Sequence, residues 1–431
     1  MKIGHLIRAE RVRQEMKQIV LAKGICTPSY LSKIERNLIE PSDEIALLLM
    51  NRLAIDPSKL QKNDEQTELE FKKLLMDTYK TVITSRNDEL TKDKLSYLEQ
   101  NSPLFENDSL HYTYLLIRLR FRLILREDIE VLKNEIEALQ HSVDQFDAYQ
   151  LYLFELNKAL FYYNTGNRKK AIFYFETILD KLDSIAMKEW EKAEFNYIIA
   201  VVYAADGHLF ASTNYIRDAL EFFRENLMMN RVLDCYILIG ITHKRSEQFQ
   251  DSLEAYSKAM QICEDLNLHS EKGIIYHNIG SLNSTMGNSD QAIHYYKKSI
   301  DHKIIDSDKL ISIFCLITEY SKLNKKKLVR YWADVGINLL KKVKDENHLS
   351  YYHHFTIYKS LHSEQGLSVE IAETAIQHFK KLQDFRYIHK YCIALAEWYY
   401  QNRKYKLSSI YYREANRYGY IYRKVEKWED L

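Results

Sequence analysis

The residues best suited to bind an anion lie in one short segment near the N-terminus, Thr27 to Arg36. Threonine at a helix N-cap, followed by Pro28 at the first helical position, is a strong helix start. The unpaired backbone N–H groups of such a start bind phosphate, and Arg8, Lys33 and Arg36 would add positive charge around it. The segment therefore predicts a helix whose first turn, from Thr27, faces a polyanion.

The charge distribution along the chain supports this interpretation. Residues 1–36 carry eight Lys and Arg against three Glu, a net charge of +5, whereas the whole chain carries +1. A small basic module on a slightly acidic body is typical of a protein in which one end meets phosphates and the other does not.

A second helix must precede the phosphate-binding one. Residues 17–23 have helical periodicity, and Gly24 marks a tight turn before Thr27. Leu21, Ala22, Leu31 and Ile34 would face inward between the two helices. A helix, a short turn with glycine and a second helix form the geometry that places the second helix in the DNA major groove. We expect about five short helices in residues 1–60.

Residues 1–60 resemble the Xre/Cro family of helix-turn-helix domains. The resemblance rests on Ile7 to Arg11 (IRxxR), Leu21-Ala22, Ser29 to Arg36 (SYLSKIER) and Pro41-Ser42. It implies base-reading and phosphate roles for Pro28, Ser29, Tyr30, Ser32 and Lys33. It also implies that Arg11 and Glu35 form a salt bridge that supports the domain and makes no DNA contact.

A single small domain of this kind discriminates too weakly for a unique genomic site. Each good base contact is worth about 1–3 kcal/mol. We therefore expect a homodimer that binds double-stranded DNA at inverted-repeat operators.

The rest of the chain predicts an all-α protein built from repeats. All four prolines lie at or before Pro103, and apolar residues recur with helical period after residue 110. Four units spaced by 40 or 41 residues share positions at intervals of 7, 5, 4 and 3, which are tetratricopeptide intervals. These positions are Ala159, Gly166, Ala171, Phe175, Ile178; Ala200, Gly207, Ser212, Ile216, Ala219; Gly240, Glu247, Ser252, Tyr256, Ala259; and Gly280, Gly287, Ala292, Tyr296, Ser299.

Each repeat position has a physical role. Small residues on the first helix of a pair let the second helix approach, and large ones such as Phe175, Tyr256 and Tyr296 fill the gap between pairs. Gly166, Gly207 and Gly287 relax the turn between helices.

The repeat pattern becomes irregular after residue 320 and returns near Ala396 to Ala415. Stacked pairs would form a right-handed superhelix with a concave face. We place a helix-turn-helix domain at 1–62, linker helices at 63–109 and the repeat domain at 110–431.

This architecture resembles the peptide-pheromone receptors of Gram-positive bacteria, the Rgg, NprR, PlcR and PrgX group with the related Rap phosphatases. The resemblance implies that the concave face binds a short signalling peptide, and that the repeats also dimerise. Asn157 and Asn278 lie two residues before the small residue and are the leading candidates, and Lys244 is a candidate partner for a peptide carboxylate. The full candidate set is Asn157, Tyr163, Tyr197, Lys244, His277, Asn278, Ser281, Thr318, Glu397 and Tyr400.

Other classes find little support in the sequence. There is no dinucleotide, P-loop, zinc-protease or serine-hydrolase motif, and His353-His354 is an isolated doublet, so we expect no enzyme, no cofactor and no metal. Five widely spaced cysteines suit reduced, buried thiols in the cytoplasm. The sequence has no apolar run long enough to span a membrane and no secretory signal, so we expect no membrane partner. Two alternatives remain, in which the repeats bind a partner protein, or the protein represses without a ligand.

Overall fold

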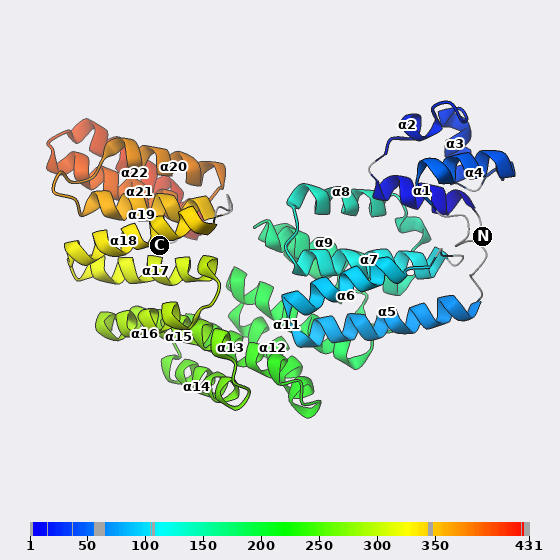
Figure 1. Cartoon of the computed structure of the whole chain (residues 1–431). Helices are drawn as coiled ribbons and strands as arrows, with labels where there is room; N and C mark the ends of the chain where they lie inside the picture. Colours follow the sequence, from blue (N-terminus) through cyan, green and yellow to red (C-terminus); the bar gives the residue numbers. More distant parts are fainter. Residues whose placement is uncertain are drawn as a thin grey trace. The chain divides into compact units, whose positions relative to one another are not determined.

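The computed structural model describes residues 3–14, 16–36, 38–55, 65–103, 105, 108–343, 348–423 and 425, and these contain helices and no strand (Figure 1). The all-α class is confirmed. Contacts divide the chain into two compact units, residues 1–238 and 239–431. Among the described residues, no helix combines the length and apolar character that a membrane crossing requires.

The N-terminal domain contains four described helices around one small core. They are α1 (Ile3–Arg13), α2 (Gln18–Ala22), α3 (Pro28–Glu35) and α4 (Asp43–Arg52). Leu21, Ala22, Leu31 and Ile34 are completely buried, which confirms the predicted inward face. The predicted fifth helix and the predicted boundary at 62/63 lie outside the described residues, so both stay predictions.

The rest of the first unit consists of α-helices of 12 to 21 residues and two short 3-10 helices, Val143–Gln145 and Leu182–Ser184. The α-helices are α5 (Glu65–Ser85), α6 (Asp88–Asn101), α7 (Asp108–Ile124), α8 (Ile129–Gln140), α9 (Ala148–Asn164), α10 (Arg168–Leu179), α11 (Glu189–Asp206), α12 (Leu209–Glu225) and α13 (Met229–Arg245), which crosses the division between the units. The helices α5 and α6, predicted as linkers, contribute Phe71, Tyr79 and Leu98 to the same core cluster as α7 to α11.

The second unit continues the series of helical pairs. Its helices after α13 are α14 (Phe249–Asp265), α15 (His269–Thr285), α16 (Ser289–His302), α17 (Asp306–Lys322), α18 (Lys326–Val343), α19 (Leu349–Leu361), α20 (Val369–Lys381), α21 (Phe385–Gln401) and α22 (Tyr405–Arg423). Neighbouring helices such as α15 and α16, or α21 and α22, pack against each other along their length (Figure 1). The frayed segment after residue 320 therefore still folds as pairs.

The repeat positions do what their residue types predict. Tyr256 and Tyr296 are buried, and a Cβ built on Gly280 would lie 2.8 Å from Cδ1 of Tyr296. Gly287 ends its helix with φ at 81°, in the left-handed region that favours glycine. The Ser252 hydroxyl donates to the Gly240 carbonyl at 2.7 Å, so the small side chain on one helix also binds the backbone of its partner.

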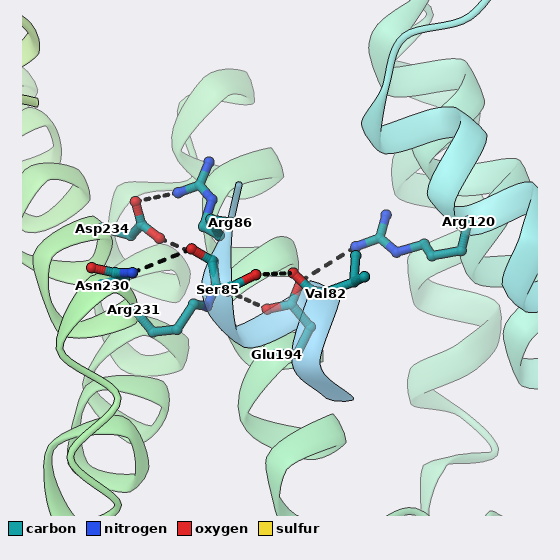
Figure 2. A network of polar contacts seen from close by, with 8 residues as sticks. All are labelled: Val82, Ser85, Arg86, Arg120, Glu194, Asn230, Arg231 and Asp234. Carbon is teal, nitrogen blue, oxygen red and sulfur yellow. Dashed lines mark hydrogen bonds and ion pairs between the residues drawn. The ribbon is translucent and has the colours of Figure 1, made fainter. Parts of the chain in front are cut away.

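A polar network, buried at Arg120, Glu194 and Arg231 and exposed at Arg86 and Asn230, fastens the turn between α5 and α6 to α13 (Figure 2). Its members are Ser85, Arg86, Arg120, Glu194, Asn230, Arg231 and Asp234. Arg231, only 2% exposed, pairs with Glu194 and with Asp234, the latter at 3.0 Å. Its guanidinium also lies over the Tyr197 ring, 4.3 Å from the centroid.

The outer part of this network reaches the turn itself. Arg86 pairs with Asp234, and the Asn230 amide donates to the Ser85 carbonyl at 3.2 Å. Arg120 of α7 joins from the other side, 3.3 Å from Glu194. Since removal of one member of a buried ion pair leaves its partner unpaired, the network holds α5, α7, α11 and α13 in one arrangement.

The packing of Gly280 against Tyr296 predicts the effect of one methyl group. Gly280→Ala should lower the melting temperature by several degrees in a thermal melt followed by circular dichroism. Overpacking costs about 1–3 kcal/mol, and the helix propensity gained by alanine offsets at most about 1 kcal/mol. Gln291→Ala, at an exposed position of α16, is the control and should leave the melt unchanged. A Gly280→Ala protein as stable as the wild type would contradict the close approach.

Candidate nucleic-acid interface and ligand-binding residues

Helix α3 presents a polar first turn to solvent because its cap and its apolar residues fix its orientation. The Thr27 hydroxyl oxygen accepts a hydrogen bond from the Tyr30 N–H at 3.2 Å, and Pro28 is the first helical residue. Both features were predicted. On the opposite face, Leu31 and Ile34 are completely buried in the domain core.

None of the predicted DNA-contact residues is buried in the domain core. Those with exposed side chains are Thr27, Pro28, Ser29, Lys33 and Arg36, and those with half-buried side chains are Arg8, Tyr30 and Ser32. The first turn thus presents the hydroxyl groups of Thr27 and Ser29 and the Ser29 N–H, because Pro28 has no N–H and the Tyr30 N–H binds Thr27, while Lys33 and Arg36 add cations farther along the helix. This is the donor set that binds phosphates and base edges.

A buried ion pair holds α3 on α1. Arg11 Nε lies 2.5 Å from Glu35 Oε1, and Arg11 Nη2 lies 2.9 Å from Oε2, so the pair is bidentate. Glu35 is 1% exposed and accepts a further bond from Gln18 of α2 at 2.6 Å. The predicted supporting role of Arg11 and Glu35 is confirmed by this geometry.

Sequence reasoning missed a second support of the same helix pair. Arg52, at the end of α4, donates from Nη1 to the Leu21 carbonyl at 3.0 Å and also contacts the Lys23 carbonyl. These carbonyls end α2 and have no partner within a helix that short. A basic residue in the last turn of α4 was visible in the sequence, but its partner lies 31 positions away.

Three of the predicted peptide contacts, Lys244, His277 and Ser281, lie together in the second unit. Lys244 Nζ of α13 donates to Ser281 Oγ of α15 at 2.8 Å. His277 lies one turn before Ser281 on α15, and burial and the charges of Lys303 and Lys244 lower its pKa to about 3. The fourth candidate, Thr318 of α17, donates from its hydroxyl to the Cys315 carbonyl of its own helix at 2.6 Å.

The neutral His277 belongs to a buried polar chain that the sequence did not predict. His277 Nδ1 lies 3.0 Å from Ser312 Oγ, which also accepts from Lys303 Nζ at 2.9 Å. Lys303 further donates to the Asp308 carbonyl, and burial lowers its pKa to about 8. This chain joins α15, the end of α16 and α17.

The other predicted residues of the second unit bind groups of their own or a neighbouring helix, or line the surface. The Asn278 amide donates to the Ile274 carbonyl of its own helix at 3.1 Å. Glu397 of α21 accepts a hydrogen bond from the Tyr412 hydroxyl of α22. Tyr400 lines an open surface hollow of about 980 Å³ on α21 and α22, together with Tyr405 and Arg413.

In the first unit, the structure corrects the prediction for Asn157. This residue is 1% exposed, and its Nδ2 donates to the Leu116 carbonyl of α7 at 2.8 Å, while its Oδ1 has no partner. The amide therefore ties α9 to α7 and is not available to a ligand. Tyr197 packs on Arg231 of the charge network, and Tyr163 is half-buried on α9.

Comparisons with known proteins agree with this two-part organisation. Family profiles for a helix-turn-helix match residues 7–60, and profiles for a tetratricopeptide repeat match residues 156–180 and 231–303. Transcriptional activator NprA of Geobacillus stearothermophilus is 31% identical over 407 residues, which cover 91% of this chain and 97% of the relative. Response regulator aspartate phosphatase I of Bacillus subtilis is 22% identical and covers 76% of this chain and 86% of its own length.

Solved structures of the quorum sensor NprR share the fold. The apo form from B. thuringiensis superposes with a TM-score of 0.64 at 19% identity and covers 81% of this chain and 99% of its own. NprR in complex with its cognate peptide NprX superposes with a TM-score of 0.60 at 18% identity, covering 80% and 98%. At this identity the likeness shows the fold alone.

The Arg11–Glu35 pair predicts a local loss of structure. Arg11→Met should destabilise the N-terminal domain by about 3 kcal/mol, because Glu35 would be left buried without its cation. Limited proteolysis of the full chain should then cut first within residues 1–55 while the repeats stay intact. Arg36→Met, at an exposed position of the same domain, is the control. Equal protease resistance of the two variants would show that the ion pair does not hold α3.

Proposed function

The chain belongs to the family of Rgg, NprR, PlcR and PrgX regulators, and from this premise we propose that it is a transcriptional regulator controlled by a short signalling peptide. Residues 1–55 bind operator DNA through α3. The repeats bind the peptide and change how the DNA-binding domains are presented. The protein acts in the cytoplasm, where both ligands are accessible.

The observation that carries the DNA-binding proposal is the exposed first turn of α3. Thr27, Pro28 and Ser29 are exposed while the opposite face of the helix fills the core. A first turn in this position can enter the major groove without rearrangement of the domain. Lys33 and Arg36 lie exposed at the other end of the helix and add phosphate contacts.

The peptide proposal is supported by the family and by the polar residues on successive first helices. A relative of the same fold, NprR, is described in complex with its cognate peptide NprX. Here Lys244, His277 and Ser281 present hydrogen-bonding groups on α13 and α15 that could bind a peptide backbone or carboxylate. We propose a homodimer, because two domains on an inverted repeat supply the discrimination that one domain lacks.

A second candidate function is binding of a partner protein by the repeats. It is favoured by the similarity to Response regulator aspartate phosphatase I, whose name describes action on a response regulator. Catalysis is not part of our proposal, because the sequence carries none of the hydrolase or nucleotide-binding motifs considered above.

One experiment tests peptide control and separates the two candidates. Genomic DNA fragments are selected on the purified full chain, with and without the peptide fraction (below about 2 kDa) of medium from the source organism. We expect recovery of inverted repeats and a change in recovery when the peptide fraction is added. DNA recovery that responds only to the protein fraction of the cells would favour the partner-protein function.

The phosphate contacts predict a change in salt dependence. Lys33→Gln together with Arg36→Gln should lower the slope of log K against log salt concentration by about 1.8, since each lost phosphate contact removes about 0.9. The measurement is fluorescence anisotropy of labelled duplex DNA between 50 and 200 mM salt, roughly the range in which such contacts dominate. Lys327→Gln, exposed on α18, is the matched control and should keep the slope. No duplex binding by the wild type at low salt would refute the DNA-binding role.

A further inference from the structure

Two hydroxyl groups and one ammonium group form a hydrogen-bonded chain that ends on the His277 ring. Ser312 Oγ of α17 lies 3.0 Å from His277 Nδ1, and Lys303 Nζ donates to the same oxygen at 2.9 Å. Ser299 Oγ of α16 is the third neighbour of the Ser312 hydroxyl, also at 2.9 Å. Both serines are completely buried and Lys303 is 7% exposed, so these groups must supply one another's protons.

The Ser312 hydroxyl uses its full hydrogen-bonding capacity in these three contacts. A hydroxyl group donates one hydrogen bond and accepts two. Burial lowers the pKa of Lys303 to about 8, so its amine is an ammonium group at neutral pH and can only donate. Ser312 therefore accepts from Lys303, and it has a single proton to give to either Ser299 or His277.

Ser299 determines where the Ser312 proton goes. The Ser299 hydroxyl donates to the Gly273 carbonyl at 2.7 Å, and a carbonyl oxygen can only accept. Since Ser299 has no second proton, the contact between the two serines needs the proton of Ser312. The remaining contact of Ser312 must then be a hydrogen bond that His277 Nδ1 donates.

His277 is therefore a neutral imidazole with its proton on Nδ1 and a lone pair on Nε2. Burial and the charges of Lys303 and Lys244 lower its pKa to about 3, so the ring carries no second proton at neutral pH. The ring also packs against Tyr296, with the two ring centroids 5.5 Å apart. The hydrogen bond and this packing together fix the direction in which Nε2 points.

The acceptor nitrogen is open to a ligand. Within the described part of the chain, His277 Nε2 makes no hydrogen bond and is not one of the buried atoms that lack a partner. The side chain is half-buried, whereas the serine that holds its other nitrogen is completely buried. The ring thus links a buried polar chain to solvent and presents an acceptor there.

Donors lie one helical turn away from this acceptor. Ser281 follows His277 by four residues on α15, and its hydroxyl accepts from Lys244 Nζ at 2.8 Å. An ammonium group has three N–H donors, so Lys244 keeps donors for a ligand. A polypeptide backbone carries both N–H and C=O groups, and an acceptor beside a donor can bind both.

We propose that His277 Nε2 accepts a hydrogen bond from an N–H group of the signalling peptide, and that His277 is thereby a specificity-determining residue. The inference rests on the proposed function, since it assigns the chemistry that the bound peptide must present at this position. A carbonyl or carboxylate oxygen placed there would face the lone pair of Nε2 and be repelled. Neutral His277 therefore selects a donor, while Lys244 beside it selects an acceptor.

The position of the proton is measured on the full chain without any peptide. The histidine rings are labelled with ¹⁵N, and a two-bond ¹H–¹⁵N correlation spectrum at pH 7 distinguishes a protonated ring nitrogen from a bare one. The signals of His277 are assigned by their loss in His277→Gln. We expect Nδ1 to be protonated and Nε2 to be bare, and a proton on Nε2 would overturn the inference.

The peptide contact is measured with a positional-scanning heptapeptide library on the full chain. One peptide from the retained pools is remade with each backbone N–H methylated in turn, and with each donor side chain replaced by alanine in turn. One of these changes should weaken binding to the wild type by about tenfold, the loss expected for a single hydrogen bond. A backbone methylation with this effect assigns the N–H to the backbone, and an alanine replacement assigns it to a side chain.

His277→Phe should bind the unmodified peptide about tenfold more weakly and should be insensitive to that one change, because the partner of the N–H is gone. His294→Phe, at an exposed histidine of α16, is the matched control and should bind both peptides as the wild type does. Thermal melts of the two variants show whether each is folded. If His277→Phe is not folded, the tautomer of the wild type decides the question.

The failure of the inference and the failure of the proposed function give different results. If a peptide is retained but no single change is coupled to His277, the acceptor role is wrong and peptide binding stands. If no pool is retained, peptide binding by the repeats fails, and the contact with His277 fails with it.

Discussion

The architecture of the repeats depends on close contact between a small residue on one helix and a large one on the next. Gly280 leaves no room for a Cβ beside Tyr296, and Ser252 binds the Gly240 backbone of the preceding helix. Each contact fixes the distance between the two helices of a pair. Successive pairs therefore stack in the same way. The residues that face a ligand are positioned by this packing, since they lie on the same helices as the small residues.

Much of the fold could be predicted because its determinants are local. The Thr27 cap, the Gly287 turn and the position of Tyr256 each follow from residue type and spacing within one helical pair. The Arg11–Glu35 pair was predicted from a family resemblance, and its geometry agrees. Even the degenerate segment around α19 and α20 folds as a pair, since its neighbours on both sides impose the same packing.

The ligand-facing residues were harder to predict, because a sequence pattern gives the face of a helix but not what covers it. Asn157 occupies the predicted position, yet α7 lies over it and takes its amide.

The charge network around Arg231 has a consequence for how the chain is made. Its contact between Ser85 and Asn230 spans 145 positions, and Arg86 finds its carboxylate only at Asp234. The ribosome synthesises the chain from its N-terminus, so α5 and α6 emerge long before α13. The turn between them can therefore form its contacts with Asn230 and Asp234 only after α13 has been synthesised. Until then, Arg86 lacks its carboxylate partner, and the first unit cannot complete its folding.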